Sequence, residues 1–524
     1  MIRAIRDYYS IREVTDRFPK LLSAIGLLIG AAAAVFYYQR GLTLSHYDAK
    51  AHLVVARRVL DSLTPEYSQI GAVWLPLPHL LNLLPVQIDW LYRTGLSGVA
   101  ISVLSFALAC YAIARLVLRV TRSRGAAAIS VAMFALDPDV LYLQSTPMTE
   151  PLLFGLVLLS ICLVYDWVGT TPVTTPATAP FATAPSAAGP VAQDFSPAKA
   201  GWCLVLACLT RYEAWMVTAA VLVLATVALW RRGFSLIAAL KAVAHLGVYP
   251  VLAIVAFFVH SWFTTGAWFV TGGFYVPDNL ATGSVYGSIM TVVYGMRTLI
   301  GTPFVLLAVA GAVAVLARGV SRVEHAASLV VLALIALIAL PAYAFFNGHP
   351  FRMRYMVAPS VGAAVFAGVA LGMLKGYARH AAIAVTAVWL VVTAKPIDAQ
   401  APMVQEAQWD VPFSVGRRNV TACLAREYHG ERILASMGSL AHYMQELSHA
   451  GIDIRDFVHE GTLPYWQEAI EAPQGRVGWI LVEERAEGGD VLAARARASS
   501  AFTSGFVRVC ADGGVALYKA EAKN

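Results

Sequence analysis

Charged residues are scarce in this chain. Only 14% of its 524 residues are Asp, Glu, Lys or Arg, whereas 58% are hydrophobic. Soluble globular domains carry about 25% charged residues, so we expect most of this chain to be solvated by lipid. The net charge of +7 comes without a basic arm or run. Nucleic acid is therefore not among the expected partners.

Cysteine is also rare, with six residues and no Cys-x-x-Cys pair that would indicate a metal site. Four of the six, Cys110, Cys162, Cys203 and Cys208, lie in apolar runs and are interpreted as small packing residues. The other two, Cys423 and Cys510, lie in the polar C-terminal region. They could form a disulfide if that region is extracytoplasmic, and the sequence leaves this pairing open.

Long apolar runs make up most of the sequence before residue 396. They predict a polytopic helical membrane protein with about eleven spans. The N-terminus shows no cleavable signal peptide, so the first span is expected to be a retained anchor. The expected limits of the spans are 19–38, 96–118, 125–143, 151–168, 199–211, 213–230, 242–262, 290–316, 326–346, 356–374 and 380–395.

Basic residues indicate the orientation, because Lys and Arg collect on the cytoplasmic side. With the N-terminus inside, nearly every inner boundary carries them, as at Arg115–Arg124, Arg231–Lys241 and Lys375–Arg379. An odd number of spans then places residues 397–524 outside the cytoplasmic (inner) membrane. We therefore expect a transmembrane domain over residues 1–396 and a small extracytoplasmic domain over 397–524.

The tail is predicted to be an α/β domain. A hairpin turn is expected at 511–514, and helices at 439–450 and 490–500. The expected strands are 432–436, 478–482, 506–510 and 515–519. In contrast, the Thr/Pro/Ala-rich segment 170–198 cannot bury a core and is predicted to be a flexible inner loop.

The outer loop 41–95 contains an amphipathic stretch at 48–62, which predicts helices lying in the membrane interface. Asp48 lies just outside the first span, and Glu150 lies at the next outer turn. For both acids the alternative is an ordinary role at a helix start, with Asp48 as an N-cap. Asp137 and Asp139 flank Pro138, which predicts a broken helix end that lines a wet cavity.

Arginines also lie at outer boundaries. Arg211 and Glu213 are found between two expected spans, where the alternative to a substrate role is an ion pair at the turn. Arg352 and Arg354 precede a late span and break the charge rule. Guanidinium groups grip phosphate bidentately, so these two arginines are candidates for anion binding. The alternative is pairing with lipid headgroups or with the tail domain.

These features together resemble the GT-C class of polytopic glycosyltransferases, similar to protein O-mannosyltransferases and the lipid A aminoarabinose transferase. The resemblance lies in the acid after the first span, the amphipathic outer helices, the acid at the next outer turn, and an Arg-Tyr-x-x-x-Pro element at Arg354, Tyr355 and Pro359. It covers residues 20–395 in layout. It implies a polyprenyl-phosphate-linked sugar donor and an acceptor that is a lipid, a glycan or a protein.

Transfer from a lipid phosphate needs a base for the acceptor hydroxyl and cations for the leaving phosphate. We expect an inverting reaction with Asp48 as base, and with Glu150 orienting Asp48 or the acceptor. The expected phosphate-binding residues are Arg352, Arg354, Arg211 and Tyr355. The expected acceptor or sugar pocket contains His52, Lys50, Trp74, His79, Glu213 and Tyr275.

Other readings remain open. A divalent metal ion shared by Asp48 and Glu150 is one, since carboxylates are ligands for such ions, and His46, Asp48 and His52 offer a second candidate set. A transporter or flippase of a lipid-linked sugar is the alternative function. A sensor or scaffold whose tail binds cell-envelope partners is a third.

Overall fold

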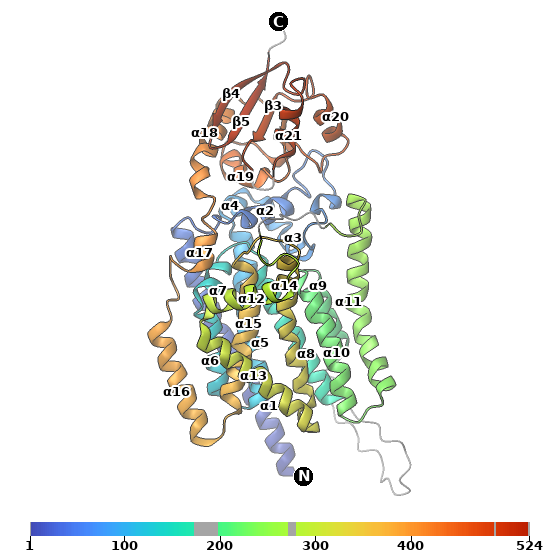
Figure 1. Ribbon diagram of the computed structural model, residues 1–524, viewed down its shortest axis with the longest axis vertical. Coiled ribbons are helices and arrows are strands. Elements are labelled where there is room, and N and C mark those ends of the chain that lie inside the picture. The colour runs from blue at the N-terminus through green and yellow to red at the C-terminus, as the bar shows by residue number, and fades with distance from the viewer. Residues whose placement is uncertain (1, 172–196, 271–278, 487–488, 522–524) are drawn as a thin grey trace.

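The computed structural model describes residues 2–171, 197–270, 279–486 and 489–521. It is elongated, with a helical part below and a small α/β domain above (Figure 1). The N-terminus lies at the helical end and the C-terminus at the far end of the α/β domain (Figure 1). The chain is a multi-pass membrane protein, as its composition predicts.

Nine helices in the described ranges are long and apolar enough to cross a membrane. They are α1 (Ile2–Gln39), α5 (Leu96–Thr121), α8 (Glu150–Thr170), α10 (Glu213–Arg231), α11 (Leu236–Thr265), α13 (Thr302–Ser321), the continuous segment of η4 (Val323–Ile338) and α14 (Ala339–Phe346), α15 (Arg354–Met373) and α16 (Gly376–Thr393). Two shorter apolar helices are α6 (Arg124–Ala135) and α9 (Pro197–Cys208).

Two of the expected spans are wrong as single helices. The span expected at 125–143 is divided into α6 and α7 (Pro138–Leu143), because Asp137 caps α7 and Pro138 opens its first turn. The span expected at 290–316 is divided into α12 (Val285–Ile300) and α13 by Gly301, whose φ of +78° few other residues adopt. The expected break at Pro138 is confirmed.

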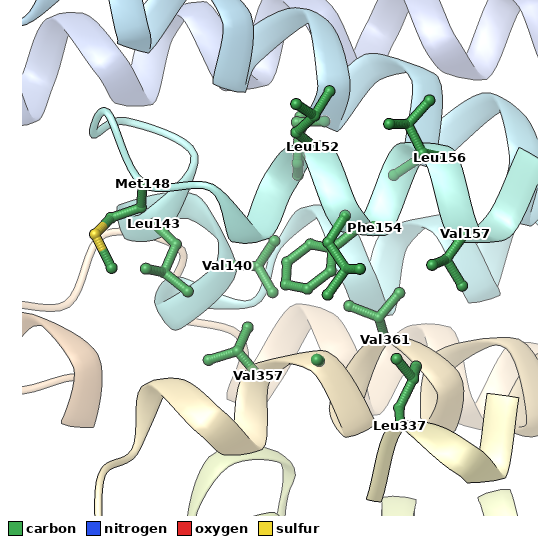
Figure 2. Packing of buried hydrophobic residues seen from close by; sticks show 14 of the residues in the cluster. Val140, Leu143, Met148, Leu152, Phe154, Leu156, Val157, Leu337, Val357 and Val361 are labelled. Atoms are coloured by element: carbon green, nitrogen blue, oxygen red, sulfur yellow. The ribbon is translucent and has the colours of Figure 1, made fainter. Parts of the chain in front are cut away.

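The centre of the membrane domain is built around α8 and α15. Of the most apolar 18-residue stretch of α15, 89% is buried inside the protein. The corresponding share for α16 is only 11%, and this helix stands at the edge of the bundle (Figure 1). Figure 2 shows Phe154 and Val157 of α8 near Val357 and Val361 of α15. Burial of such apolar surface holds α15 in place and so fixes the position of the residues at its outer end.

The outer loop forms a layer between the membrane helices and the C-terminal domain (Figure 1). Its elements are α2 (Tyr47–Arg57), η1 (Tyr67–Ile70), α3 (Leu77–Asn82), η2 (Pro85–Gln87) and α4 (Asp89–Thr94). The polar side of residues 48–62 is covered by protein. Arg57, Arg58 and Asp61 are buried, while Leu60 is 49% exposed, because the polar side packs against the C-terminal domain.

The C-terminal domain has a five-stranded sheet in the order β2-β1-β3-β5-β4. Strand β1 (Ile433–Ala435) pairs in parallel with β2 (Phe457–Val458) and β3 (Trp479–Glu483), and β5 (Val515–Ala520) is antiparallel to β3 and to β4 (Phe506–Asp512). The helices and turns are α17 (Pro402–Glu406), α18 (Val411–Glu427), α19 (Leu440–His449), η5 (Ile454–Asp456), α20 (Tyr465–Glu471) and α21 (Val491–Ala498).

The predicted α/β class, four of the strands, two helices and the hairpin turn are confirmed. Strand β2 was missed because it has only two residues, too few to show an alternating pattern. A disulfide between Cys423 of α18 and Cys510 of β4 is formed, which settles the pairing that the sequence leaves open.

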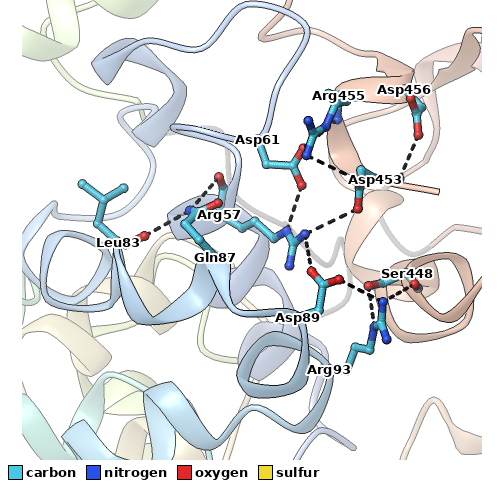
Figure 3. A network of polar contacts seen from close by, with 10 residues as sticks. All are labelled: Arg57, Asp61, Leu83, Gln87, Asp89, Arg93, Ser448, Asp453, Arg455 and Asp456. Atoms are coloured by element: carbon cyan, nitrogen blue, oxygen red, sulfur yellow. Dashed lines mark hydrogen bonds and ion pairs between the residues drawn. The ribbon is translucent and has the colours of Figure 1, made fainter. Parts of the chain in front are cut away.

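A buried polar network ties the outer loop to the C-terminal domain, as Figure 3 shows. Arg57 Nε lies 2.8 Å from Asp61 Oδ2, and Arg57 Nη2 lies 2.7 Å from Asp89 and 3.4 Å from Asp453. Arg455 Nε reaches Asp61 Oδ1 at 3.0 Å. Since Asp453 and Arg455 belong to the C-terminal domain, these contacts fix how that domain sits over the membrane helices.

We predict that Arg57→Met destabilises this contact strongly. The Arg57 side chain is only 5% exposed, so its loss leaves the buried carboxylate of Asp61, which is 3% exposed, with only the exposed Arg455 as its cation. Breaking a buried pair in this way costs about 3–5 kcal/mol. Thermal unfolding of the full chain in detergent should show a lower midpoint. Asp89→Asn is the control, because Asp89 is 49% exposed and its loss should cost under about 1 kcal/mol. Equal midpoints for Arg57→Met and the parent chain would contradict this account.

Candidate active site

Asp48 lies in the first turn of α2. The helix is capped by His46, whose Nδ1 accepts a hydrogen bond of 3.0 Å from the backbone N–H of Asp48. The alternative role of Asp48 as the N-cap is therefore wrong, since His46 holds that position. The Asp48 carboxylate does not cap the helix and makes a different contact.

That contact is an ion pair with Arg354, which is 306 residues away in sequence at the start of α15. The two side chains are 13% and 16% exposed. Arg354 Nη2 also donates to the hydroxyl of Tyr355 at 3.2 Å. Burial alone would raise the pKa of Asp48, but the Arg354 charge and hydrogen bond hold it well below its usual range.

Glu406 fixes the backbone from which Arg354 projects. This residue ends α17, and its Oε2 accepts from the N–H of Met353 at 2.5 Å while Oε1 accepts from the N–H of Arg354 at 3.4 Å. The first N–H groups of α15 have no partner within the helix, and a carboxylate placed at this end of a helix is stabilised. Burial nevertheless leaves the pKa of Glu406 raised. The C-terminal region thus positions Arg354 without touching its guanidinium.

A cavity of about 510 Å³ lies between the outer loop and the C-terminal domain. Asp48 and Arg354 form part of its wall, together with Arg352, which stands 5.8 Å from the ring centre of Trp409. The C-terminal domain and the segment leading into it contribute Glu406, Trp409, Asp410, Phe413, Arg417, Ser436, Ser439, His442, Glu483 and Arg485.

Four groups on the C-terminal wall, Asp410, Arg417, His442 and Glu483, are paired with one another. Arg417 forms an ion pair with Asp410 and lies 3.7 Å from Glu483. His442 Nδ1 lies 3.3 Å from Asp410, and Tyr443 donates to Glu483 at 2.7 Å. This wall therefore offers hydrogen-bonding groups of both signs, which suits a polar ligand.

A second cavity of about 270 Å³ lies on the membrane side of the same ion pair. Apolar residues Val73, Leu340, Pro341 and Ala344 form part of its wall. Four residues line both cavities, namely Asp48, His349, Arg354 and Tyr355. The ion pair between Asp48 and Arg354 thus separates a polar cavity from a smaller, more apolar one.

Arg211 is the other cation of the smaller cavity. It lies 2.8 Å from Glu213, 3.0 Å from Glu150 and 3.0 Å from the hydroxyl of Thr149. Two carboxylates thus surround one guanidinium, and they raise the pKa of Arg211 against the effect of burial. The ion pair that the sequence offers as the alternative for Arg211 and Glu213 is formed.

Aromatic rings complete the smaller cavity. His52 Nδ1 lies 3.1 Å from His79 Nε2, and the Trp74 ring centre is 4.2 Å from that of His52. Burial lowers the pKa of His52 well below its usual value and that of His79 to about 3, so both rings are neutral near pH 7. Neutral imidazoles beside an indole form a surface that can contact a sugar ring without adding charge.

The structure brings most of the predicted site residues together. Arg211, Arg354, Tyr355, His52, Trp74, His79 and Glu213 all line the smaller cavity. Arg352 lines only the larger one, and Lys50 lines neither. Glu150 also lines neither, since it is 1% exposed beside Arg211. Tyr275 lies outside the described residues. The roles assigned to all of these residues stay predictions.

The candidate metal ligands are engaged elsewhere. His46 accepts from the backbone of Asp48, His52 faces His79, and Asp48 and Glu150 each pair with an arginine. Across the described ranges, no group of three or more His, Cys, Asp or Glu side chains is arranged to hold a metal ion.

Sequence reasoning missed the residues that the C-terminal region contributes, above all Glu406, Asp410, Arg417, His442 and Glu483. They are spread over about 80 residues between α17 and β3, and none forms a recognisable motif. The one available signal was the density of charge directly after the last apolar span, where Glu406, Asp410 and Arg417 follow one another closely.

Solved structures share this architecture. ArnT from Cupriavidus metallidurans in the apo state is similar with a TM-score of 0.57 and 14% identity, over 95% of this chain and 99% of its own. ArnT bound to undecaprenyl phosphate gives 0.56 and 13%, over 95% and 98%. The apo oligosaccharyltransferase of Archaeoglobus fulgidus gives 0.49 and 12%, over 88% and 69%. No family model and no curated protein sequence matches the chain. The chain therefore has the fold of ArnT, and the predicted GT-C layout is confirmed as a fold.

We predict that Arg354→Gln makes Asp48 reactive toward a water-soluble carbodiimide, which attacks protonated carboxyl groups. At about pH 4.5 an ordinary Asp with a pKa of about 3.9 is partly protonated. The lowered pKa keeps Asp48 ionised there, and without Arg354 burial would raise it. Peptide mass spectrometry should find Asp48 unlabelled in the parent chain and labelled in the variant. The matched control, Arg352→Gln, should leave Asp48 unlabelled. Equal labelling of Asp48 in the parent and Arg354→Gln chains would contradict the pairing.

Proposed function

We propose that this protein is a membrane glycosyltransferase that moves a sugar from a polyprenyl-phosphate donor to an acceptor at the outer face of the membrane. The observation that carries the proposal is the ion pair of Asp48 and Arg354, which borders two cavities of different character. A base and a phosphate-binding cation at one point between two cavities match the needs of group transfer. The fold likeness to ArnT, solved with undecaprenyl phosphate, agrees with this reading.

The smaller cavity is assigned to the donor. Its apolar wall suits an isoprenoid chain, and Arg354 suits the phosphate, since a guanidinium binds two phosphate oxygens at once. Arg211 is already neutralised by Glu150 and Glu213, so its part is to hold the cavity wall rather than to bind the phosphate first. The sugar then lies near His52 and Trp74.

The larger cavity is assigned to the acceptor, which is a lipid, a glycan or a protein. In the reaction the Asp48 carboxylate takes the proton of the acceptor hydroxyl, and that oxygen attacks the anomeric carbon. The bond from the anomeric carbon to the phosphate oxygen breaks, and the electron pair leaves with the polyprenyl phosphate. Attack and departure on opposite faces invert the configuration. Arg354 stabilises the charge that develops on the leaving phosphate.

The ion pair gives this reaction an order. While Arg354 holds Asp48, the low pKa of the carboxyl makes it a poor base. A donor phosphate competes for the same guanidinium, which weakens the hold on Asp48 and raises its pKa toward a useful range. The base is then active only when the donor is bound, so an acceptor that arrives first keeps its hydroxyl proton until the donor is in place.

The side of the membrane is part of the proposal. We infer that the N-terminus lies inside and the C-terminal domain outside the cytoplasmic membrane. The disulfide between Cys423 and Cys510 supports this placement, since disulfides persist in oxidising compartments. The basic residues at the opposite ends of the spans support it as well.

We predict that Asp48→Asn lowers turnover by about 10²–10⁴-fold, the usual contribution of a general base. The measurement is release of radiolabelled sugar from a polyprenyl-phosphate donor by the full chain in membranes. Asp89→Asn, a change of the same kind in the same outer layer, should leave turnover unaltered. Full activity of Asp48→Asn would contradict the assignment. Movement of intact labelled lipid across the membrane without release of sugar would favour the flippase instead.

We predict that Arg354→Gln weakens donor binding as well as turnover. Hydrogen bonds to charged groups contribute about 1.5–3 kcal/mol, so the Kd for polyprenyl phosphate should rise about 10–100-fold. Arg352→Gln is the matched control, because Arg352 lines only the larger cavity and should leave this Kd unaltered. If Arg352→Gln weakened donor binding more than Arg354→Gln, the donor would belong in the larger cavity.

A further inference from the structure

A third cavity of about 400 Å³ lies away from the candidate active site and shares no lining residue with it. Its walls come from α6, the end of α12, α13, α15 and α16, and its end is formed by α7 and the segment between α16 and α17. Helix α16 stands at the edge of the bundle in Figure 1, with most of its surface exposed. The cavity is therefore bordered by the helix that is least covered by protein.

The walls of this cavity are mostly apolar. Phe134, Leu299, Phe304, Trp389 and Leu390 line it, and the rings of Phe304 and Trp389 have centres 4.1 Å apart. An apolar space between a peripheral span and the bundle, at the level where lipid surrounds the protein, suits an acyl chain. Such walls alone would not distinguish one lipid from another.

The end of the cavity is charged. It holds three carboxylates, those of Asp137, Asp139 and Asp398, and one ammonium, that of Lys395. Each carboxylate accepts backbone N–H groups through a single oxygen: Asp137 from Asp139 and Val140, Asp139 from Met403, and Asp398 from Gln400. Among the residues that the structure describes, none of these four charged groups has an ion-pair partner within 4.0 Å.

The side chain of Asp139 gives the strongest indication that this cavity binds a ligand. It is 1% exposed, and its Oδ2 has no hydrogen-bond partner within the described part of the chain. A buried carboxylate oxygen without a donor is costly, and a cation placed beside it would remove that cost.

We propose that this cavity binds one zwitterionic phospholipid whose headgroup carries a primary ammonium beside its phosphate, of the phosphatidylethanolamine type. The ammonium lies by Asp137 and Asp139, the phosphate by Lys395, and an acyl chain along Phe304 and Trp389. Lys395 follows the end of α16, where headgroups meet the hydrocarbon. Anionic lipids and the polyprenyl phosphate are disfavoured by the three carboxylates. A trimethylammonium headgroup has no N–H to offer Asp139 Oδ2.

Native mass spectrometry of the full chain in detergent tests this proposal. The chain is titrated separately with phosphatidylethanolamine, phosphatidylglycerol, phosphatidylcholine and polyprenyl phosphate. We expect one phosphatidylethanolamine to be retained with an affinity about 10–100-fold above those of phosphatidylglycerol and phosphatidylcholine, the ratio expected for lost charged hydrogen bonds. The double variant Asp137→Asn/Asp139→Asn keeps an oxygen acceptor for each backbone N–H. It should lose the preference.

A second variant and a control distinguish a loss of lipid binding from a loss of folding. Lys395→Gln changes an exposed residue of the linker and should reduce retention of phosphatidylethanolamine while leaving the melting midpoint of the lipid-free chain unaltered. Glu324→Gln, an exposed acid where the segment Val323–Phe346 begins, should have no effect on retention. Equal retention of all three phospholipids by the parent chain would overturn the proposal. So would a preference that survives in the double variant, or retention of polyprenyl phosphate that the same substitutions abolish.

Discussion

The ion pair between Asp48 and Arg354 is the interaction on which the candidate site depends. It joins the first outer helix to the start of the most buried span, and it forms the boundary between two cavities. Its partners sit on rigid supports, since His46 caps α2 and Glu406 holds the first N–H groups of α15. A carboxylate and a guanidinium held this firmly keep each other ionised, so a ligand that competes for one changes the chemistry of the other.

The C-terminal domain is part of the site rather than an appendage. It closes the larger cavity with charged groups that are already paired, and the network around Arg57 fixes its position over the outer loop. Helix α17 makes two hydrogen-bond contacts that connect distant parts of the molecule. Met403 donates to Asp139 beside the third cavity, and Glu406 holds the backbone of Arg354. One short helix, α17, therefore touches both the candidate lipid site and the candidate active site.

The sequence revealed those features that charge and hydropathy express locally. Asp48, Arg211 and Arg354 were found because a charged residue beside an apolar span is energetically costly, and such a residue therefore indicates a functional or structural role. The strands of three residues or more in the tail were found, whereas β2, which has only two, was not. The amphipathic character of residues 48–62 was read from the sequence, but a sequence does not show that another domain covers their polar side. The residues that the C-terminal region contributes to the larger cavity were missed for the same reason, since they meet only through the tertiary fold.

The most direct test of the central claim is a structure of the full chain with a polyprenyl-phosphate sugar bound. The account predicts the phosphate oxygens within about 2.7–2.9 Å of the Arg354 guanidinium, as in other charge-assisted hydrogen bonds. It also predicts that the Asp48 carboxylate is released from Arg354 and faces the anomeric carbon from the side of the larger cavity. A donor phosphate bound elsewhere, with the ion pair of Asp48 and Arg354 intact and remote from the sugar, would contradict it.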